Sequence, residues 1–376
     1  MSASATGDFS DFNVGHFDFG EEVRKQVQKA LEARGRVNVV IAGRSGVGKS
    51  TLINAVFQGN MAETGQGRPV TPNTREITKE GIPLTVFDTR GIEMDKYKET
   101  LAELERLVKE RASDPDPMRH IHVAWLCIAE DSRRVEMGES KLHEMLAAHV
   151  PVLGVVTKAR SDNGFRAEVQ RLLPQARNVL RVRALGNEDD DGHILNPKGL
   201  MELVDATMEV VPEGQRNAFV AAQRVNMLVK VMRAHMVVAG FATTAAGIGA
   251  IPIPFSDAIL LVPAQIGMLA SITAVFGLPV SKAFLSTLVG SGIGAGGAAF
   301  VGRAIVAGLL KFIPGAGSLA GGAIAAGTAA TLTTVIGEAY IATLAALFEK
   351  AGGATPGEAE ISEAFGHALA KRRQSA

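Results

Sequence analysis

The stretch Gly43-Arg44-Ser45-Gly46-Val47-Gly48-Lys49-Ser50 matches the pattern G-x-x-x-x-G-K-[ST]. The apolar residues 36–42 precede it and predict a strand covered on both faces, as in a parallel sheet. Residues 50–57 follow with helical spacing. A glycine-rich turn between a strand and a helix predicts a loop whose backbone N–H groups surround phosphate oxygens, beside the positive end of the helix.

The residue types of this loop suit a nucleoside triphosphate bound with Mg²⁺. The glycines permit the tight backbone turns, Lys49 reaches the β- and γ-phosphates as a catalytic residue, and the Ser50 hydroxyl binds the metal. The residues expected to contact the nucleotide here are Gly43, Arg44, Ser45, Gly46, Val47, Gly48, Lys49, Ser50 and Thr51.

A carboxylate for the metal comes from Asp88-Thr89-Arg90-Gly91, directly after the apolar residues 84–87. At the end of a second strand, Asp88 is expected to hold Mg²⁺ through water, and the Gly91 N–H to face the γ-phosphate.

Residues 65–77, between the two motifs, are polar and rich in turn residues. They predict a loop that becomes ordered when the γ-phosphate and Mg²⁺ are bound. Thr71 or Thr74 offers the hydroxyl that completes the metal shell. We favour Thr71 as this catalytic metal ligand, because its spacing from Asp88 leaves room for one edge strand. The alternative is that both threonines only form turns.

Strand-like and helix-like segments alternate as far as residue 211. This alternation predicts an α/β domain with a mostly parallel sheet and helices on both faces. The further strands are expected at residues 84–87, 121–129, 152–156 and 179–184, and the helices at residues 97–111, 136–148, 165–173 and 199–210. A helix at residues 20–34 is expected to dock on this domain, and residues 217–232 to form one connecting helix.

The α/β half resembles the translation-factor-like P-loop GTPases, particularly the Era-like branch. The stretch GRSGVGKST is similar to the first motif of that branch, and DTRG stands where the branch usually has DTPG. Val155-Val156-Thr157-Lys158-Ala159 looks like the base-reading element [NT]-K-x-D. The resemblance implies GTP and GDP as ligands, Mg²⁺ as cofactor and GTP hydrolysis. It also implies base contacts from Thr157 and Lys158, and from the backbone of Ala184.

Two positions depart from the family pattern. Arg160 occupies the place of the guanine-reading Asp, and Asp162 follows two residues later as a substitute through a loop shift. Guanine and adenine selectivity both stay open at this point. Ile92 stands where many small GTPases carry a water-positioning Gln, so the resemblance implies slow hydrolysis, on the order of 10⁻⁴ to 10⁻² per second without a partner.

Composition excludes several classes of protein. The 39 basic residues balance the 39 acidic ones, which argues against a general nucleic-acid binder. The single cysteine, Cys127, excludes a disulfide scaffold and a cysteine-based zinc site.

The apolar second half differs in kind from the first. Residues 234–348 contain five charged side chains, and four uncharged runs cover residues 236–256, 258–281, 283–302 and 312–337. Each run is long enough to cross a bilayer as a helix, so we expect an all-α, Gly/Ala-rich domain associated with membrane lipid, with the GTPase domain cytoplasmic. The alternative is a soluble helical bundle or oligomer interface. This half resembles the YcjF-type domain of unknown function around residues 251–257.

The expected organisation is an N-terminal segment and helix at residues 1–35, the GTPase domain at 36–211 and a connecting helix at 212–233. The hydrophobic domain at 234–350 and a polar tail at 351–376 complete it. Nucleotide-dependent loops would control the hydrophobic domain through the connection. An activating protein or a second copy is the expected protein partner.

Overall fold

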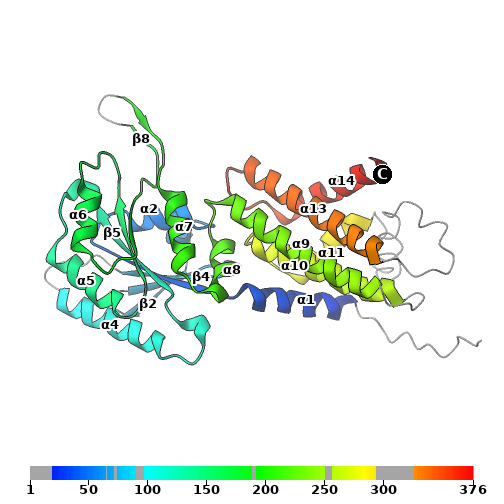
Figure 1. The fold of residues 1–376 in the computed structure, drawn as a ribbon, viewed down its shortest axis with the longest axis horizontal. Helices are drawn as coiled ribbons and strands as arrows, with labels where there is room; N and C mark the ends of the chain where they lie inside the picture. Colours follow the sequence, from blue (N-terminus) through cyan, green and yellow to red (C-terminus); the bar gives the residue numbers. More distant parts are fainter. Residues whose placement is uncertain are drawn as a thin grey trace, which may run out of the picture.

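A computed structural model describes residues 19–64, 66–71, 74–89, 97–188, 192–249, 256–293 and 326–375. An α/β domain and a helical domain lie next to each other along the long axis of the molecule (Figure 1).

A seven-stranded sheet with the order β2-β3-β4-β1-β5-β6-β7 forms the centre of the α/β domain. The five strands from β4 to β7 in this order are parallel, and β3 and β2 extend the sheet in antiparallel fashion. This arrangement confirms the predicted mostly parallel sheet. The strands are β1 Val37–Ala42, β2 Gln66–Thr71, β3 Thr74–Thr78, β4 Leu84–Thr89, β5 Val123–Ala129, β6 Val152–Thr157 and β7 Asn178–Arg181.

Helices cover both faces of the sheet, as predicted. Leu52 of α2, Leu203 of α7 and Phe219 of α8 are buried in the core on one face. Leu107 of α4 and Leu142 of α5 are buried in the core on the other, together with residues of α6. The helices are α2 Lys49–Val56, α4 Tyr97–Ala112, α5 Met137–Ala147, α6 Phe165–Leu172, α7 Leu200–Val210 and α8 Glu213–Ala222. The short elements are α3 Met61–Thr64, η2 Pro117–Arg119, η3 Glu130–Ser132, β8 Asn187–Glu188 and β9 Ile194–Leu195.

The prediction of a loop at residues 65–77 was wrong, because this segment contains β2 and β3. The β-branched residues Thr74 and Ile77 are both buried, on a strand that lies between two others. This strand was difficult to predict because polar residues flank Thr74 and Ile77 in the sequence. Threonine also occurs both in strands and in turns.

Among the described residues, the helical domain combines the first helix with helices from the second half of the sequence. Its helices are α1 Phe19–Arg34, α9 Met227–Gly249, α10 Ser256–Val275, α11 Lys282–Ile293, α13 Ala326–Lys350 and α14 Glu358–Ser375. Val23 and Ala30 of α1 are buried in this domain's core, and α1 packs along α10. The expectation that this helix docks on the α/β domain was therefore wrong. The sequence predicted the apolar stripe of this helix correctly. The helix that packs on the stripe, α10, lies more than 200 residues later in the sequence.

Two helices, α8 of the α/β domain and α9 of the helical domain, meet where one connecting helix over residues 217–232 was predicted. The chain turns between α8 and α9, and Gln223 and Asn226 close the turn. The Gln223 amide donates to the Asn226 carbonyl at 2.9 Å and accepts from the Asn226 amide at 2.7 Å. Asn226 Oδ1 then accepts from Val229 N at 3.1 Å at the start of α9. Helix-start bonds of this kind are typical of asparagine.

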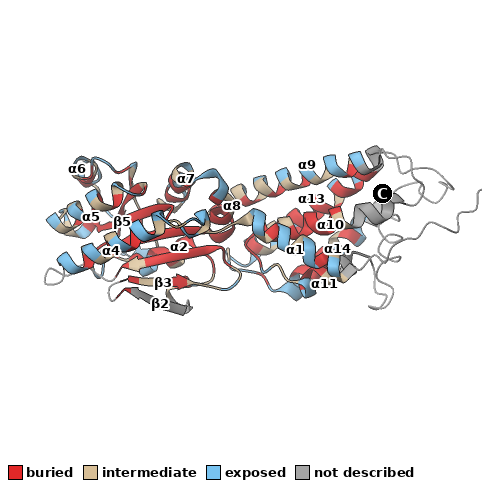
Figure 2. Cartoon of the chain, turned by 90° about the horizontal axis from the view of Figure 1, so that it is seen from below, coloured by how far each residue is buried: buried red, intermediate tan, exposed pale blue. Residues whose placement is uncertain are grey.

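One helix segment among the described residues, Ala329–Lys350, is long and apolar enough to cross a membrane, with a mean hydropathy of 1.5. Its most apolar part is 61% buried inside the protein, so a core helix satisfies the same criterion. Figure 2 shows α10 and α13 buried along much of their lengths. The runs at residues 283–302 and 312–337, and the stretch at 251–257, lie partly outside the described residues, which include 256–293 and 326–375.

Candidate nucleotide-binding site

The glycine-rich loop joins β1 to α2 with three positive backbone angles. The φ values are 143° at Gly43, 77° at Gly46 and 94° at Gly48, which side-chain-bearing residues rarely adopt. A Cβ atom on Gly43 would also lie 2.4 Å from the carbonyl oxygen of Cys127 on β5. The loop can therefore close against the sheet only with glycine at this position.

Lys49, the first residue of α2, lies folded against the loop. Its side chain is 8% exposed, and Nζ donates to the carbonyl oxygens of Gly43 at 2.8 Å and Arg44 at 3.1 Å. Burial lowers the pKa of Lys49, while the nearby Asp88 carboxylate opposes this shift. An ammonium is thus held over the loop by weak neutral acceptors, which a stronger anionic acceptor can replace.

Asp88 lies near the carboxyl end of β4, opposite Ile41 of β1 and Arg75 of β3 in the sheet register. Burial raises the pKa of Asp88, and Lys49 and Arg75 oppose that effect. Its Oδ1 is buried and has no hydrogen-bond partner among the described residues. A carboxylate oxygen of this kind, with the exposed Ser50 at the start of α2, fits a site for Mg²⁺, which prefers oxygen ligands.

The two candidate threonines lie in one row of the sheet. Thr71 pairs with Thr74, and Thr74 pairs with Thr89. Because side chains alternate along a strand, Thr74 and its neighbour Arg75 point to opposite faces, and Arg75 shares the face of Asp88. The structure thus brings Arg75, which the sequence reasoning missed, to Asp88. The metal-binding role of Thr71 stays a prediction, and Gly91 lies outside the described residues.

A cavity of about 670 Å³ opens beside the loop and contains most of the predicted base-contacting residues. The Thr157 hydroxyl donates to the carbonyl of Val47 at 2.6 Å, which ties the end of β6 to the phosphate loop. Lys158 follows with a positive φ of 53°. The cavity is lined by Val47, Gly48, Thr51, Leu52, Glu130, Asp131, Arg133, Thr157, Lys158, Arg160, Ser161, Val182, Arg183, Ala184, Leu185, Gly186 and Asn187.

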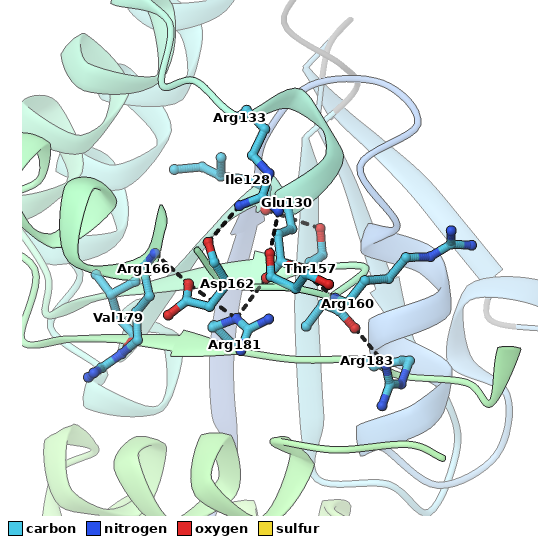
Figure 3. A network of polar contacts seen from close by, with 12 residues as sticks. Ile128, Glu130, Arg133, Thr157, Arg160, Asp162, Arg166, Val179, Arg181 and Arg183 are labelled. Atoms are coloured by element: carbon cyan, nitrogen blue, oxygen red, sulfur yellow. Dashed lines mark hydrogen bonds and ion pairs between the residues drawn. The ribbon is translucent and has the colours of Figure 1, made fainter. Parts of the chain in front are cut away.

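Asp162 lies outside this lining, in the polar network of Figure 3. Its Oδ1 accepts a hydrogen bond from the Arg166 amide at 2.8 Å, in the first turn of α6. The same oxygen lies 3.4 Å from Arg181 Nε. The carboxylate offered as the guanine-reading group therefore stabilises the start of a helix in this structure.

Glu130 is the acid at the centre of the network (Figure 3). It is 2% exposed and accepts hydrogen bonds from the Arg160 amide at 2.6 Å and from Arg181 Nε at 2.7 Å. Burial opposes its ionisation, but the bonds from Arg181 and the Arg160 amide outweigh burial and lower the pKa of Glu130. Sequence reasoning missed Glu130. The sequence feature that could have identified it is an acidic residue directly after a wholly apolar strand. That strand ends at the same edge of the sheet as the phosphate loop.

Known proteins match the α/β half of the chain. The family model of the 50S ribosome-binding GTPases matches residues 38–158. The tRNA modification GTPase MnmE of Paracidovorax citrulli (strain AAC00-1) is 29% identical over 203 residues, which are 51% of this chain and 40% of that protein. The MnmE of Desulfotalea psychrophila (strain LSv54 / DSM 12343) is 30% identical over 143 residues, covering 37% of this chain and 28% of that protein.

Among solved structures, a crystal structure of a probable GTP-binding protein engB covers 46% of this chain and 98% of its own, with 18% identity and a TM-score of 0.32. The chain spans less than half the length of the curated relatives named above. Residues 38–158 form a P-loop GTPase domain of the TrmE/Era/EngB class. This confirms the expected GTPase resemblance at the level of that class.

Proposed function

We propose that this chain binds GTP, hydrolyses it slowly to GDP and phosphate, and uses its nucleotide state to control the helical domain. The observation that carries the proposal is that a buried ammonium, Lys49, and the unpartnered carboxylate oxygen of Asp88 lie close together at the glycine-rich loop, near enough to affect each other's pKa. A bound triphosphate would replace the carbonyl acceptors of Lys49 and receive the N–H groups of residues 43–51.

In this proposal Ser50 and Asp88 hold Mg²⁺ in the triphosphate state, and Thr71 joins them when its segment rearranges. The ion would neutralise the charge that develops between the β- and γ-phosphates. Lys49 would stabilise the same charge through its ammonium group. With Ile92 in place of a water-positioning side chain, hydrolysis waits for an activating protein or a second copy.

Guanine selectivity belongs to the same proposal. Thr157, Lys158 and the backbone at Ala184 line the cavity that would take the base. Glu130 fixes the loop at Arg160 from behind, through the backbone amide. A P-loop ATPase is the alternative, because Arg160 replaces the carboxylate that pairs with guanine.

Nucleotide affinity tests the proposal directly. The full chain should bind GTP with Mg²⁺ far more tightly than ATP, and Lys49→Ala should lose most of that affinity. Lys141→Ala, on the exposed face of α5, is the matched control. Equal affinity for ATP would identify an ATPase, and binding independent of both Mg²⁺ and Lys49 would remove the switch.

The helical domain is the proposed output of the switch. Its uncharged runs, the apolar helix segment Ala329–Lys350 and the resemblance to YcjF-type domains support association with membrane lipid, with the GTPase domain on the cytoplasmic side. Arg224 and Arg233, at the start of the helical domain, would then face the cytoplasmic surface.

A second candidate is a nucleotide-dependent scaffold whose helical half binds a partner or a second copy. One observation favours it. The amphipathic helices α1 and α14 cover the bundle, with Ile361, Phe365 and Leu369 of α14 buried in its core. Membrane flotation of the full chain with GDP and with a non-hydrolysable GTP analogue separates the two candidates. Nucleotide-dependent flotation supports the membrane, whereas nucleotide-dependent oligomerisation without flotation supports the scaffold.

A further inference from the structure

We infer that the α/β domain carries a second anion site, for a phosphoryl group, at the edge of the sheet opposite the nucleotide cavity. A cavity of about 330 Å³ lies there between α4, η2 and the sheet. It is lined by Arg36, Asn38, Glu76, Thr85, Phe87, Arg111, Met118 and Arg119.

The lining carries more positive than negative charge. Three guanidinium groups face one acid among these lining residues, Glu76. Arg111 is 16% exposed, lies 3.4 Å from the Glu76 carboxylate and stands over the Phe87 ring at 5.2 Å. Arg119 is paired at 3.1 Å with Asp114. Glu76 and Asp114 are therefore already paired with two of the arginines.

Arg36 is the third arginine of the lining, and its hydrogen bond among the described residues is to a neutral group. Its Nη1 donates to the Thr85 hydroxyl at 2.7 Å. Burial lowers the pKa of Arg36, and Glu76 opposes that shift. A half-buried cation held mainly by a hydroxyl is unfavourable unless a counter-charge completes its surroundings.

Arg34 is a further guanidinium close enough to Arg36 to affect its charge, although it is not part of the cavity lining. Its Nη1 donates to the Gly81 carbonyl at 3.1 Å, and its Nε is buried without a partner in the described part of the chain. Burial and the neighbouring Arg36 lower the pKa of Arg34 to about 10, so the group still carries its charge at neutral pH. The three arginines of the lining thus face one acid of the lining, and a bound anion would supply the missing negative charge.

The chemistry favours a phosphoryl group. Guanidinium forks bind phosphate oxygens in a bidentate manner, and arginine stays protonated where lysine loses its proton on burial. The cavity volume suits a pyrophosphate-sized group with a few further atoms. Such a group comes either from a soluble organic phosphate or from a phospholipid headgroup.

The site is separate from the nucleotide cavity. Asn38 stands near the start of β1 and Gly43 follows its end, so the two lie roughly 16 Å apart along the strand. The arginine cavity also adjoins the short link from α1 to β1, since Arg34 ends α1 and Val37 begins β1. A ligand here would bind where the helical domain enters the α/β domain.

Calorimetry with inorganic pyrophosphate tests the inference. The full chain carrying Lys49→Ala, in Mg²⁺-free buffer, weakens the phosphate loop as a competing site. We expect one saturable site that Arg111→Met weakens at least tenfold. Arg106→Met, an exposed arginine on the same helix, should leave the affinity unchanged. Arg111→Lys, which keeps the charge but loses the fork, should fall between these two variants.

Unchanged binding in Arg111→Met, or no saturable binding in the parent, would overturn the inference. The melting temperature of each variant shows whether it is folded. If Arg111→Met is unfolded, the pyrophosphate affinity of Arg111→Lys compared with that of the parent tests the inference instead. Vesicles of phosphatidylcholine with and without phosphatidic acid separate the two sources. Binding to the phosphatidic acid vesicles points to a headgroup, whereas binding of pyrophosphate alone points to a soluble phosphate. Neither outcome depends on GTP binding, so the inference and the proposed function fail separately.

Discussion

Gln58 and Lys230 donate hydrogen bonds to the same two carbonyl oxygens, those of Ala221 and Phe276. Gln58 Nε2 lies 2.8 Å and 3.1 Å from these oxygens, and Lys230 Nζ lies 2.8 Å and 3.0 Å from them. Gln58 stands just beyond the end of α2, the helix that begins at Lys49, whereas Lys230 belongs to α9. The helix behind the phosphate loop is thus bonded directly to the helical domain.

Gln58→Ala should weaken this link. Lys230 still satisfies both carbonyls, so the free energy of unfolding should fall by only about 1 kcal/mol. The larger effect should be on coupling. Hydrogen exchange at the turn around Phe276 should differ between the GDP and GTP-analogue states in the parent and lose that difference in the variant. A variant that keeps the full difference would contradict the link, and Gln170→Ala on α6 serves as control.

Lys230→Met should change how stability depends on pH. Lys230 is fully buried, and burial lowers its pKa well below the ordinary value. Below about pH 10.4 the unfolded chain therefore binds a proton at Lys230 that the folded protein does not bind. The contribution of Lys230 to the free energy of unfolding thus increases as pH rises towards about 10.4 and decreases as pH falls. Denaturation with urea across this range should show the parent gaining stability relative to Lys230→Met as pH increases. A pH-independent difference would show that the lysine stays protonated, and Lys141→Met is the exposed control.

Gly43→Ala should destroy the phosphate loop. The new Cβ would meet the Cys127 carbonyl at 2.4 Å, at a φ of 143°. We expect a loss of roughly 1–3 kcal/mol of stability and a GTP affinity reduced more than tenfold. Gly214→Ala in α8 is the matched control, because nothing lies within 4 Å of its added Cβ. That substitution should stabilise the helix by up to about 1 kcal/mol. Calorimetric GTP binding with thermal unfolding measures both effects, and equal behaviour of the two variants would refute the steric argument.

Glu130→Gln should loosen the base-binding loop. It removes the charge that Arg181 faces in a buried setting, so we expect the stability to fall by about 1–3 kcal/mol and GTP affinity to fall with it. The pKa of Glu130 is lower in the folded protein than in the unfolded chain. Its contribution to the free energy of unfolding is therefore fully present above about pH 4.3, and it is lost as the pH falls through the pKa of the folded protein. The parent and Glu130→Gln should therefore converge in stability in acid. Glu144→Gln, exposed on α5, should show neither effect.

Local patterns predicted the α/β domain because its chemistry is local. The glycines, lysine and serine of residues 43–50 are neighbours in the sequence, in the loop and the first turn of α2, and the buried strands are continuous apolar runs. The departures depend on distant partners. The threonines of β3 adopt strand conformation because β3 pairs with β2 on one side and with β4 on the other. Similarly, α1 packs on α10, which is distant in the sequence. Asp162 was predicted to read the base because it follows Arg160 by two residues, and this role stays a prediction. In the structure its Oδ1 accepts from the Arg166 amide and lies 3.4 Å from Arg181 Nε, contacts that depend on tertiary structure.

Because α1 packs with α10, the entire α/β domain is inserted between the first two helices of the helical bundle. During synthesis on the ribosome, α1 emerges first and must wait for its partner, while the inserted domain can fold around its own sheet. The contact between α1 and α10 therefore forms only after the α/β domain has been synthesised. A nascent chain that stalls before α10 leaves the apolar stripe of α1 uncovered, so Val23 and Ala30 would be exposed to cellular quality control.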